Sequence, residues 1–391
     1  MASHASGVSG FRATDVLINA LSVSYGGSVT VGQELTSALA RVRPDWDFTL
    51  VVKGGDQVFP TIDERTLPSN VQVMRAPAAT ANRAWRVAYE NMVLSRWVQQ
   101  SGVRAVLQLN GMIVPAMRVP TLTQHQNPWP YRPDVMETMS ERFVAALQRR
   151  EHARAFREAS FIGWTSGYLR DLVCGYFGLD PREKSDVFYN GVTQIEPAET
   201  LPWSSRPMEI LTVSTVQPHK RQDLVIRAVA ALSRRRGFED LRYRIAGYSE
   251  RNMLQRLQRV AAEEGVSDRI IFEGHVSQER LAELYGRARV FAFMSVCECF
   301  GLPPLEAMAY GTPTVASDSS SAREIYGDAV EYCPPDELDL LVESLAHVLT
   351  NEERATELAR LGRARRKLYQ WDVTATRMSA RLESLMAKRP T

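Results

Sequence analysis

Two glutamates, eight residues apart, frame a short loop that contains a glycine. Glu298 follows an apolar run, 290–294, which predicts a buried strand. Glu306 is expected in the first turn of a helix, because Pro303 and Pro304 are tolerated only where a helix begins. Free amides at a helix start attract anions, and carboxylates accept hydrogen bonds from sugar or ribose hydroxyls. The alternative is a solvated loop glutamate and a second glutamate favoured near a helix N-terminus.

A lysine occupies a comparable position in a second strand–loop–helix unit. The run 209–213 predicts a strand and 221–234 predicts a helix, so Lys220 lies beside the helix start. The ammonium and the helix dipole then both face one anion site. The alternative is a solvated lysine.

A glycine pair lies between the first predicted strand, 15–20, and a predicted helix over 30–42. Gly26 and Gly27 let the backbone approach a ligand closely and present N–H groups to an anion. The pair is not a G-x-G-x-x-G dinucleotide fingerprint. The alternative is a simple turn.

Strands alternate with helices along the chain, which predicts parallel, doubly wound α/β sheets that bind ligands beyond their carboxyl ends. His125 ends one of these strands, either at the ligand edge or as a turn histidine bonded to the backbone. The aromatic and proline-rich segment 125–133 either shapes an acceptor pocket or is a rigid loop. Further strands are predicted at 47–52, 71–74, 105–109, 120–124, 160–164, 243–246, 269–272 and 314–316. Further helices are predicted at 82–100, 281–287, 337–350, 352–369 and 371–386.

Size and composition indicate a soluble globular protein of two domains. The chain has 391 residues, of which 45% are hydrophobic and 24% charged. Its net charge of +2 argues against bulk electrostatic binding to nucleic acid. No apolar run approaches the roughly 20 residues of a membrane-spanning helix, and the N-terminus lacks an apolar signal core. We therefore expect a cytoplasmic protein.

The four cysteines are expected to be reduced, structural thiols. Cys174, Cys297, Cys299 and Cys333 form no zinc-type pair, and metal or redox use of the lone C-x-C is the alternative. No acidic D-x-D motif for a divalent ion and no carboxylate pair with clear hydrolase spacing are identified. A two-carboxylate hydrolysis mechanism is therefore not supported.

The stretch ECFGLPPLEAMAYGTP, which begins at Glu298, resembles the E-x7-E signature of the retaining glycosyltransferases of family four. The likeness continues through SDSSSAREIYGDAVEYCPPDE. That family has the GT-B fold, in which two Rossmann-like domains face each other across a cleft. The resemblance implies an acceptor-side domain over 1–192, a linker over 193–208, a nucleotide-sugar-binding domain over 209–370 and a final helix, 371–391, that crosses back to the first domain.

The resemblance also implies catalytic roles. Glu298 would contact the transferred sugar, and Glu306 would bind the ribose hydroxyls of the nucleotide. Lys220 would bind the donor diphosphate and steady the leaving group. His125, at the end of its strand, would face the transferred sugar. The implied catalytic residues are Glu298, Lys220 and His125.

The rest of the donor site follows from the same resemblance. The glycine-rich loop would face the diphosphate and the acceptor, and the turn Gly274–His275–Val276 would lie against the nucleotide base. The implied donor-binding set is Gly26, Gly27, Thr215, Lys220, Arg221, Gly274, His275, Val276, Glu298, Cys299, Phe300, Gly301, Leu302 and Glu306.

Three positions depart from the commonest family pattern. Cys299 stands where the family usually has glycine. Thr215 stands where the family often has an arginine, a loss that His219 or Arg221 would have to offset. Ser320 and the serine after it replace a frequent Gly-Gly. The threonine and the serines resemble a subset of bacterial surface-polysaccharide mannosyltransferases and related enzymes.

The resemblance implies a retaining hexosyltransferase that needs neither a metal nor a cofactor, with the nucleotide sugar as a substrate. GDP-mannose is the first expected donor and a UDP-sugar the second, with a glycan, a lipid-linked glycan or a small glycoside as acceptor. The alternatives are a sugar-nucleotide epimerase on the same fold and a non-catalytic protein that binds nucleotide sugars. The basic residues Arg363, Arg365, Arg366 and Lys367 are expected to form a solvated face, with peripheral contact to anionic lipid at the inner membrane face as the alternative.

Overall fold

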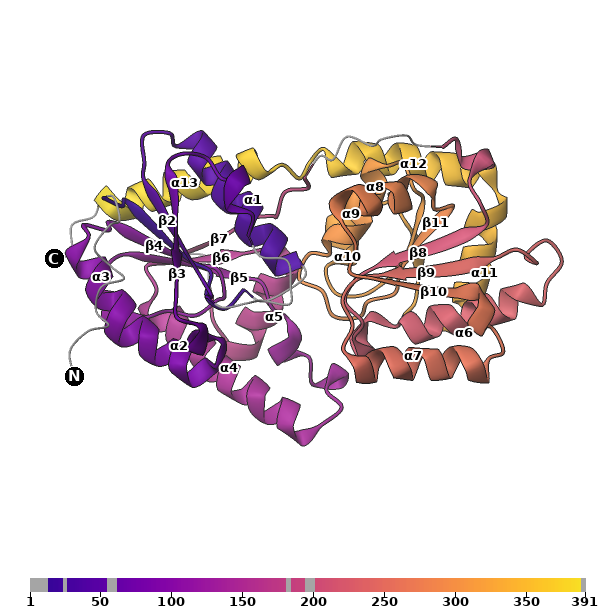
Figure 1. The fold of residues 1–391 in the computed structure, drawn as a ribbon, viewed down its shortest axis with the longest axis horizontal. Coiled ribbons are helices and arrows are strands. Elements are labelled where there is room, and N and C mark those ends of the chain that lie inside the picture. The colour runs from indigo at the N-terminus through magenta and orange to yellow at the C-terminus, as the bar shows by residue number, and fades with distance from the viewer. Residues whose placement is uncertain (1–12, 24–26, 55–61, 181–183, 194–200, 388–391) are drawn as a thin grey trace. The chain divides into compact units, whose positions relative to one another are not determined.

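The structure is a computed structural model that describes residues 13–23, 27–54, 62–180, 184–193 and 201–387 (Figure 1). The chain divides into two compact units. Unit 1 comprises Met1–Tyr131, Thr138–Gly191 and Gln370–Thr391, and unit 2 comprises Arg132–Glu137 and Val192–Tyr369. Each unit is therefore assembled from segments that are separated in the sequence.

The sheet of unit 1 has seven parallel strands in the order β3-β2-β1-β4-β5-β6-β7. The strand order reverses between β1 and β4, and ligands of such sheets bind beyond the carboxyl ends at this switch point. The strands are β1 Val16–Asn19, β2 Phe48–Val52, β3 Val71–Arg75, β4 Ala105–Gln108, β5 Thr121–His125, β6 Phe161–Trp164 and β7 Ser185–Val187.

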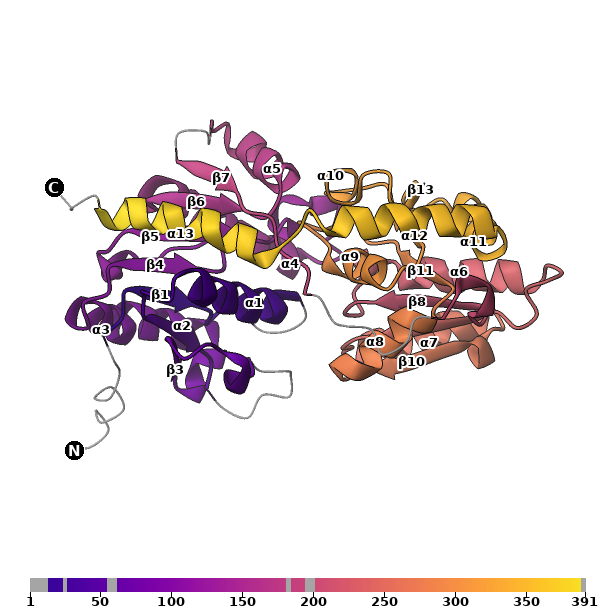
Figure 2. The ribbon, with the colours of Figure 1, turned by 90° about the horizontal axis from the view of Figure 1, so that it is seen from above.

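Helices cover both faces of this sheet. Helix α13 (Trp371–Ala387) packs along α1 (Gly27–Val42) on one face (Figure 2), and α2, α3 and α4 lie on the other face (Figure 1). Buried apolar side chains of β1, β2 and β4 pack against those of α3. The remaining helices of this unit are α2 Arg83–Tyr89, a π-helical turn η3 Glu90–Leu94, α3 Ser95–Gln100, α4 Met139–Glu158 and α5 Gly167–Phe177.

The sheet of unit 2 has six parallel strands in the order β10-β9-β8-β11-β12-β13. Strands β8 and β11 are neighbours although about 80 residues of sequence separate them, so the loops that follow them meet at one edge. The strands are β8 Glu209–Val213, β9 Arg242–Ala246, β10 Ile270–Gly274, β11 Val290–Phe293, β12 Thr314–Ser317 and β13 Glu331–Cys333.

Alternating side chains along these strands supply two separate cores. Ile210 packs with α6, α7 and α11 below the sheet, whereas Leu211 packs with α8 and α9 on the opposite face. A strand buried on both faces reads as a continuous apolar run, which is why 209–213 and 290–294 were recognisable in the sequence. The helices are α6 Gln222–Ser233, α7 Arg251–Glu263, α8 Gln278–Arg287, α9 Leu302–Ala309, α10 Ala322–Tyr326, α11 Leu338–Thr350 and α12 Glu352–Arg366.

The predicted fold class, two parallel doubly wound sheets with helices on both faces, is confirmed. The single helix predicted over 82–100 is interrupted, because the turn Glu90–Leu94 is π-helical. Four elements were not predicted: α4, α5, α7 and β13.

The predicted linker, 193–208, is wrong over its second half. Residues 194–200 lie outside the described residues, but 201–208 pack onto unit 2. Arg206 anchors them, because its buried guanidinium donates to the carbonyls of Leu201, Ala288 and Tyr310. The structured part of unit 2 therefore begins before β8.

Candidate functional site

The loop that carries Glu298 runs from the end of β11 to the start of α9, and side chains from the next loop hold its carbonyls. Ser319 Oγ donates to the carbonyl of Ser295 at 3.2 Å, and Ser320 Oγ donates to that of Val296 at 2.8 Å. At the other end, the buried Tyr326 hydroxyl donates to the carbonyl of Gly301 at 3.0 Å. These hydrogen bonds, one of them from Ser320 in the place of the frequent Gly-Gly, therefore hold the path of this loop.

Gly301 has φ +79°, a conformation that side chains rarely adopt. A Cβ at this position would also overlap the hydroxyl of Tyr326. The loop can therefore turn into the N-terminus of α9 only with glycine here. The free amides at the start of α9 follow directly after it.

Lys220 and Glu298 form an ion pair, with side chains only 14% and 17% exposed. Lys220 ends the short helix η9 (Pro218–Lys220) that follows β8, and Glu298 follows β11. The two residues meet because β8 and β11 are adjacent parallel strands. Their placement thus agrees with the expectation that both belong to one site. In this structure the ammonium of Lys220 pairs with the carboxylate of Glu298.

Of the two other basic groups near Lys220, one is neutral and the other is paired with a carboxylate. Burial, together with the charge of Lys220, lowers the pKa of His219 to about 4, so this imidazole is neutral near pH 7. Arg221, at φ +54°, pairs with Asp336 at 2.6 Å. The carbonyl of Thr215 accepts a hydrogen bond from Gln222 at 3.1 Å.

Glu306 is the fifth residue of α9, so it lies in the second turn and not in the first turn as predicted. The buried hydroxyl of Tyr285, from α8, donates to its carboxylate at 2.7 Å. Burial raises the pKa of Glu306, and this hydrogen bond partly opposes the rise. The carboxylate is thus oriented from behind by a group that the sequence did not indicate.

The predicted base-binding turn lies at the same edge of the sheet. Gly274 ends β10 with φ +67°, and its carbonyl accepts from the amide of Gly247 at 2.7 Å. His275 is exposed and Val276 is partly buried. The structure therefore gathers the predicted donor residues of unit 2 on the loops after β8, β10 and β11, at the carboxyl edge where such sheets bind ligands.

The predicted glycine-rich loop is described only in part. Gly26 lies outside the described residues, and Gly27 is the first residue of α1. A Cβ at Gly27 would meet no atom within 4 Å. Its predicted role toward the diphosphate and the acceptor stays a prediction.

His125 ends β5 as predicted, but its side chain is only 1% exposed. Its ring stacks on that of Phe156, with 5.3 Å between the ring centroids. The centroids of the His152 and Trp164 rings each lie 4.8 Å from that of His125. Burial, aided by His152, holds the pKa of His125 well below its usual value. The imidazole is therefore neutral and packed among aromatic rings, and its predicted role toward the sugar stays a prediction.

Arg132 was not singled out from the sequence, although it lies within the segment 125–133. Its Nη1 donates to the carbonyl of Val296 at 2.7 Å and to Ser320 Oγ at 3.1 Å. It therefore contacts the loop of Glu298 from a distant part of the sequence. The only local signal is an arginine between a tyrosine and a proline.

The chain does contain one D-x-D triplet, Asp45–Trp46–Asp47, which corrects the statement that none is present. Asp45 pairs with Arg43 at 2.7 Å, and Asp47 precedes β2 at the amino edge of the sheet. No group of three or more His, Cys, Asp or Glu residues in the described ranges could hold a metal ion.

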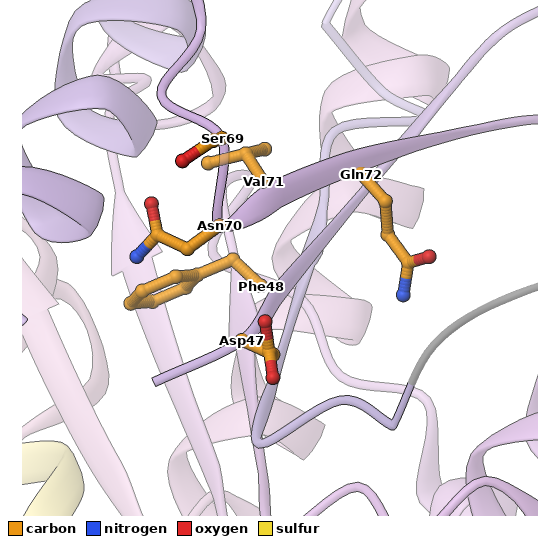
Figure 3. A pocket seen from close by; sticks show the side chains of 6 residues that line it. All are labelled: Asp47, Phe48, Ser69, Asn70, Val71 and Gln72. Atoms are coloured by element: carbon orange, nitrogen blue, oxygen red, sulfur yellow. The ribbon is translucent and has the colours of Figure 1, made fainter. Parts of the chain in front are cut away.

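A pocket does lie at this amino edge, between the starts of β2 and β3 (Figure 3). Its polar groups are used within the chain. Asn70 donates to the carbonyls of Ala40, Arg43 and Trp46, and Gln72 donates to Thr14 and Thr49. The pocket is therefore part of the structural framework and is not a site for the predicted donor.

The cysteines are free thiols in the structure, and three of the four are buried. Burial raises the pKa of Cys297 to about 12 and that of Cys174 and of Cys333 to about 11. Such thiols are poor nucleophiles. Cys299, in the loop of Glu298, is the partly exposed one.

The basic residues near the end of α12 do not form one solvated face. Arg363 and Lys367 are exposed, but Arg365 donates to the carbonyl of Ile325 at 2.8 Å. The prediction of a solvated face is therefore wrong for Arg365. No described helix combines the length and apolar character that a bilayer crossing requires.

Known proteins resemble this chain in sequence and in fold. Residues 196–365 match the family model described as glycosyl transferases group 1. The D-inositol 3-phosphate glycosyltransferase of Nocardia farcinica is 29% identical over 66% of this chain and 58% of its own length. The serotype-specific mannosyltransferase WbdA of Escherichia coli is 30% identical over 42% of this chain and 20% of its own length. The chain therefore spans about half of one relative and a fifth of the other.

A relative of more similar length is the O-antigen chain mannosyltransferase RfbU of Salmonella typhimurium, which is 23% identical over 70% of this chain and 72% of its own length. Among solved structures, sucrose-phosphate synthase from Thermosynechococcus elongatus matches with a TM-score of 0.80 at 18% identity, over 95% of this chain and 99% of that chain. Anabaena HepE, in complex with UDP and glucose, matches with a TM-score of 0.73 at 19% identity, over 95% and 100%. Residues 196–365 are therefore similar in sequence to the glycosyl transferases group 1 family, and the chain has the GT-B fold.

Proposed function

We propose that the protein is a glycosyltransferase that moves a hexose from a nucleotide sugar to an acceptor hydroxyl. The observation that carries this proposal is the ion pair between Lys220 and Glu298 beside the start of α9, with Glu306 in the same helix. A cation, free amides and two carboxylates at one edge match a ligand that combines phosphates with hydroxyls.

The ion pair suggests how the donor would be received. In the proposed complex, the diphosphate takes the ammonium of Lys220, and the carboxylate of Glu298 is then available to the sugar hydroxyls. The bond between the anomeric carbon and the diphosphate oxygen breaks, and Lys220 and the amides of α9 stabilise the charge that develops on the leaving group. The acceptor oxygen bonds to the anomeric carbon, and its proton passes to a donor phosphate oxygen. The reaction retains the anomeric configuration and requires no metal.

We propose GDP-mannose as the first donor to test and a UDP-sugar as the second. The similarity to proteins named as mannosyltransferases supports mannose. The similarity in fold to HepE, which was solved with UDP and glucose, supports a UDP-sugar. A glycan, a lipid-linked glycan or a small glycoside would be the acceptor, reached at the cytoplasmic face of the membrane.

Thermal-shift screening of the protein against a panel of nucleotide sugars tests donor binding, because a ligand that binds only the folded chain raises its melting temperature. Product analysis with the selected donor then tests the reaction. Transfer to an acceptor supports the proposal. Conversion of the donor into another sugar nucleotide without any acceptor would identify an epimerase, and the lack of any selective shift would contradict donor binding.

The substitution Glu298→Ala tests the site. We expect it to reduce transfer by about 10²-fold or more, the scale seen when one preorganised polar contact to a transition state is removed. The substitution also removes the partner of the largely buried Lys220 ammonium and should lower the melting temperature, so transfer is compared at a temperature at which both proteins are folded. Full turnover by a folded Glu298→Ala protein would show that the donor site lies elsewhere.

A further inference from the structure

A six-residue segment of the chain, Arg132–Glu137, belongs to unit 2 although Tyr131 and Thr138 on either side belong to unit 1. Two arginine contacts hold it there. Arg256 pairs with Glu137 at 3.1 Å on an exposed surface. Arg132, whose side chain is only 19% exposed, contacts the loop of Glu298. The Arg256–Glu137 pair is thus exposed, whereas the Arg132 side chain is largely buried against the loop of Glu298.

The guanidinium of Arg132 donates hydrogen bonds both to Asp134 and to the loop of Glu298. Nε and Nη2 donate to Asp134 at 2.9 and 2.6 Å, which fixes the plane of the group. Nη1 then donates to the carbonyl of Val296 at 2.7 Å and to Ser320 Oγ at 3.1 Å. A planar fork can make these bonds together, whereas a lysine ammonium is a point charge on a flexible stem.

The peptide groups of Val296 connect this contact to the ion pair. The Val296 carbonyl accepts from both Arg132 and Ser320, and the Val296 amide donates to the carbonyl of His219 at 2.9 Å. His219 directly precedes Lys220, and Val296 lies two residues before Glu298. One residue therefore links Arg132 to both members of the ion pair.

The charge of Arg132 is also felt in this cluster. Burial lowers the pKa of His219, the charges of Lys220 and Arg132 lower it further, and the charge of Glu298 opposes them. Arg132 likewise acts on Cys297 next to Glu298. These effects agree with a position of the guanidinium close to the ion pair.

We propose that Arg132 is a positioning residue of the donor site, which holds the Val296 carbonyl and thereby sets where the carboxylate of Glu298 lies. This inference rests on the proposed function, because it assigns Glu298 to the transferred sugar. Arg132 acts through the loop and does not touch the donor. Its loss should therefore affect the transfer step more than the affinity for the nucleotide, whose predicted contacts, Gly274 and Glu306, lie outside the loop that Arg132 holds, in β10 and in α9.

The first experiment compares Arg132→Gln, Arg132→Lys and Arg256→Gln in the full-length protein, with the donor selected by the thermal-shift panel. A displaced carboxylate should lower kcat of Arg132→Gln by about 10- to 100-fold, with the donor KM changed less than about threefold. Arg132→Lys, which keeps a donor for Val296 but not the fork, should lie between this variant and the wild type. Arg256→Gln loosens the same segment at an exposed pair and should stay within about twofold of the wild type.

The second experiment needs no activity. Cys299 lies in the loop of Glu298 and is partly exposed, whereas the other three cysteines are buried. Its alkylation by iodoacetamide should therefore report on the order of the loop, with Cys299→Ser as the blank. A loop released by Arg132→Gln should react about threefold faster or more, and the loop of Arg256→Gln should react at the wild-type rate.

Either measurement can overturn the inference. Wild-type kcat and alkylation in Arg132→Gln would show that Arg132 does not position Glu298. An equal loss in Arg256→Gln, or a rise in the donor KM that accounts for the whole loss in Arg132→Gln, would assign Arg132 to general docking or to nucleotide binding. A wild-type protein that transfers no sugar from any donor would instead contradict the proposed function, and the alkylation rates would still decide whether Arg132 holds the loop.

Discussion

Glu306 is a partly buried carboxylate whose desolvation costs stability. The hydroxyl of Tyr285 donates to it, and the ring of Tyr285 stacks on that of Tyr310, with 5.5 Å between the ring centroids. Burial is the main cause that raises the pKa of Glu306, and it also raises the pKa of Tyr285. A carboxylate at this position can also accept a hydrogen bond from a ligand hydroxyl.

The sign of the pH effect follows from this raised pKa. The folded chain holds the proton of Glu306 more tightly than the unfolded chain, so the free energy of unfolding falls as pH rises through the interval between the two pKa values. The variant Glu306→Gln cannot ionise at this position, so its free energy of unfolding lacks this fall with pH. Its amide oxygen can still accept a hydrogen bond from Tyr285. We therefore expect the variant to melt roughly 1–3 °C above the wild type at pH 7, with a difference that shrinks as the pH falls toward about 4.

The same variant should bind the donor about tenfold more weakly, because a neutral amide replaces a charged acceptor for the ribose hydroxyls. Thermal unfolding at pH 4 and pH 7 and titration with the donor would measure both effects. Glu263→Gln, at an exposed glutamate of α7, is the matched control and should change neither. A Glu306→Gln protein that is less stable at pH 7 would contradict the account of a costly buried charge.

The resemblance implied that Lys220 and Glu298 share a site, and the sequence pattern agrees with it, because each residue follows an apolar strand and parallel strands end at one edge. Neither the resemblance nor the pattern was sufficient for Tyr285 or Arg132. Each of these reaches the site from a distant segment, and its contact depends on packing that no local pattern encodes. Arg132 and Val296 are 164 positions apart.

At the scale of elements, Arg206 is the anchor for the chain that enters β8. Its guanidinium is 5% exposed and donates to three carbonyls and to the hydroxyl of Thr312, at 2.9 to 3.1 Å. Burial lowers its pKa to about 10, so the group is still charged at pH 7. No carboxylate is among these four partners, and the guanidinium is stabilised by neutral oxygens.

Arg206→Lys should destabilise unit 2, because three ammonium donors on a flexible stem cannot satisfy four fixed acceptors. A buried carbonyl left without its donor costs about 1–3 kcal/mol, and we expect a loss of that size in the free energy of unfolding. Urea unfolding would measure it, with the exposed Arg236→Lys as control. If both variants unfolded at the same urea concentration, the segment 201–208 would not depend on Arg206.

The elements that sequence reasoning missed carried signals of a different kind. The α4 helix is too polar for a clear apolar period, but Thr138 and Glu141 form a capping box at its start. Ser166 caps α5, and Gly178 ends it at φ +64°. Capping signals would thus have located two helices that hydrophobic periodicity did not. The short edge strand β13 has three residues and no such mark.

At the scale of the whole molecule, the chain returns to unit 1 at Gln370. The resemblance predicted this return and the amphipathic pattern of 371–386 predicted its helix, yet neither gave the contacts that seat it. Thr374 Oγ1 donates to the carbonyl of Tyr189 at 2.5 Å, and Asp372 pairs with Arg41 at 2.8 Å. These contacts join the last helix to residues more than 180 positions earlier. The sequence therefore predicted that α13 exists but not the register in which it docks.

Gly191 offers the sharpest test of this docking. A Cβ at Gly191 would overlap the backbone and ring of Trp371, the first residue of α13 and itself 6% exposed. Gly191→Ala must therefore displace the helix start, and we expect a loss of about 1–3 kcal/mol in the free energy of unfolding, as for other overpacked sites. The backbone atoms of Trp371 cannot move aside as a flexible side chain could.

Gly175→Ala is the matched control for the same substitution. Gly175 is exposed on α5, and a Cβ there would meet nothing within 4 Å. Alanine should stabilise this helix by roughly 0.5–1 kcal/mol, because it loses less backbone entropy than glycine on folding. Urea unfolding of the two variants should thus shift in opposite directions from the wild type. A Gly191→Ala protein as stable as the wild type would show that α13 begins elsewhere and that Trp371 does not pack against this turn.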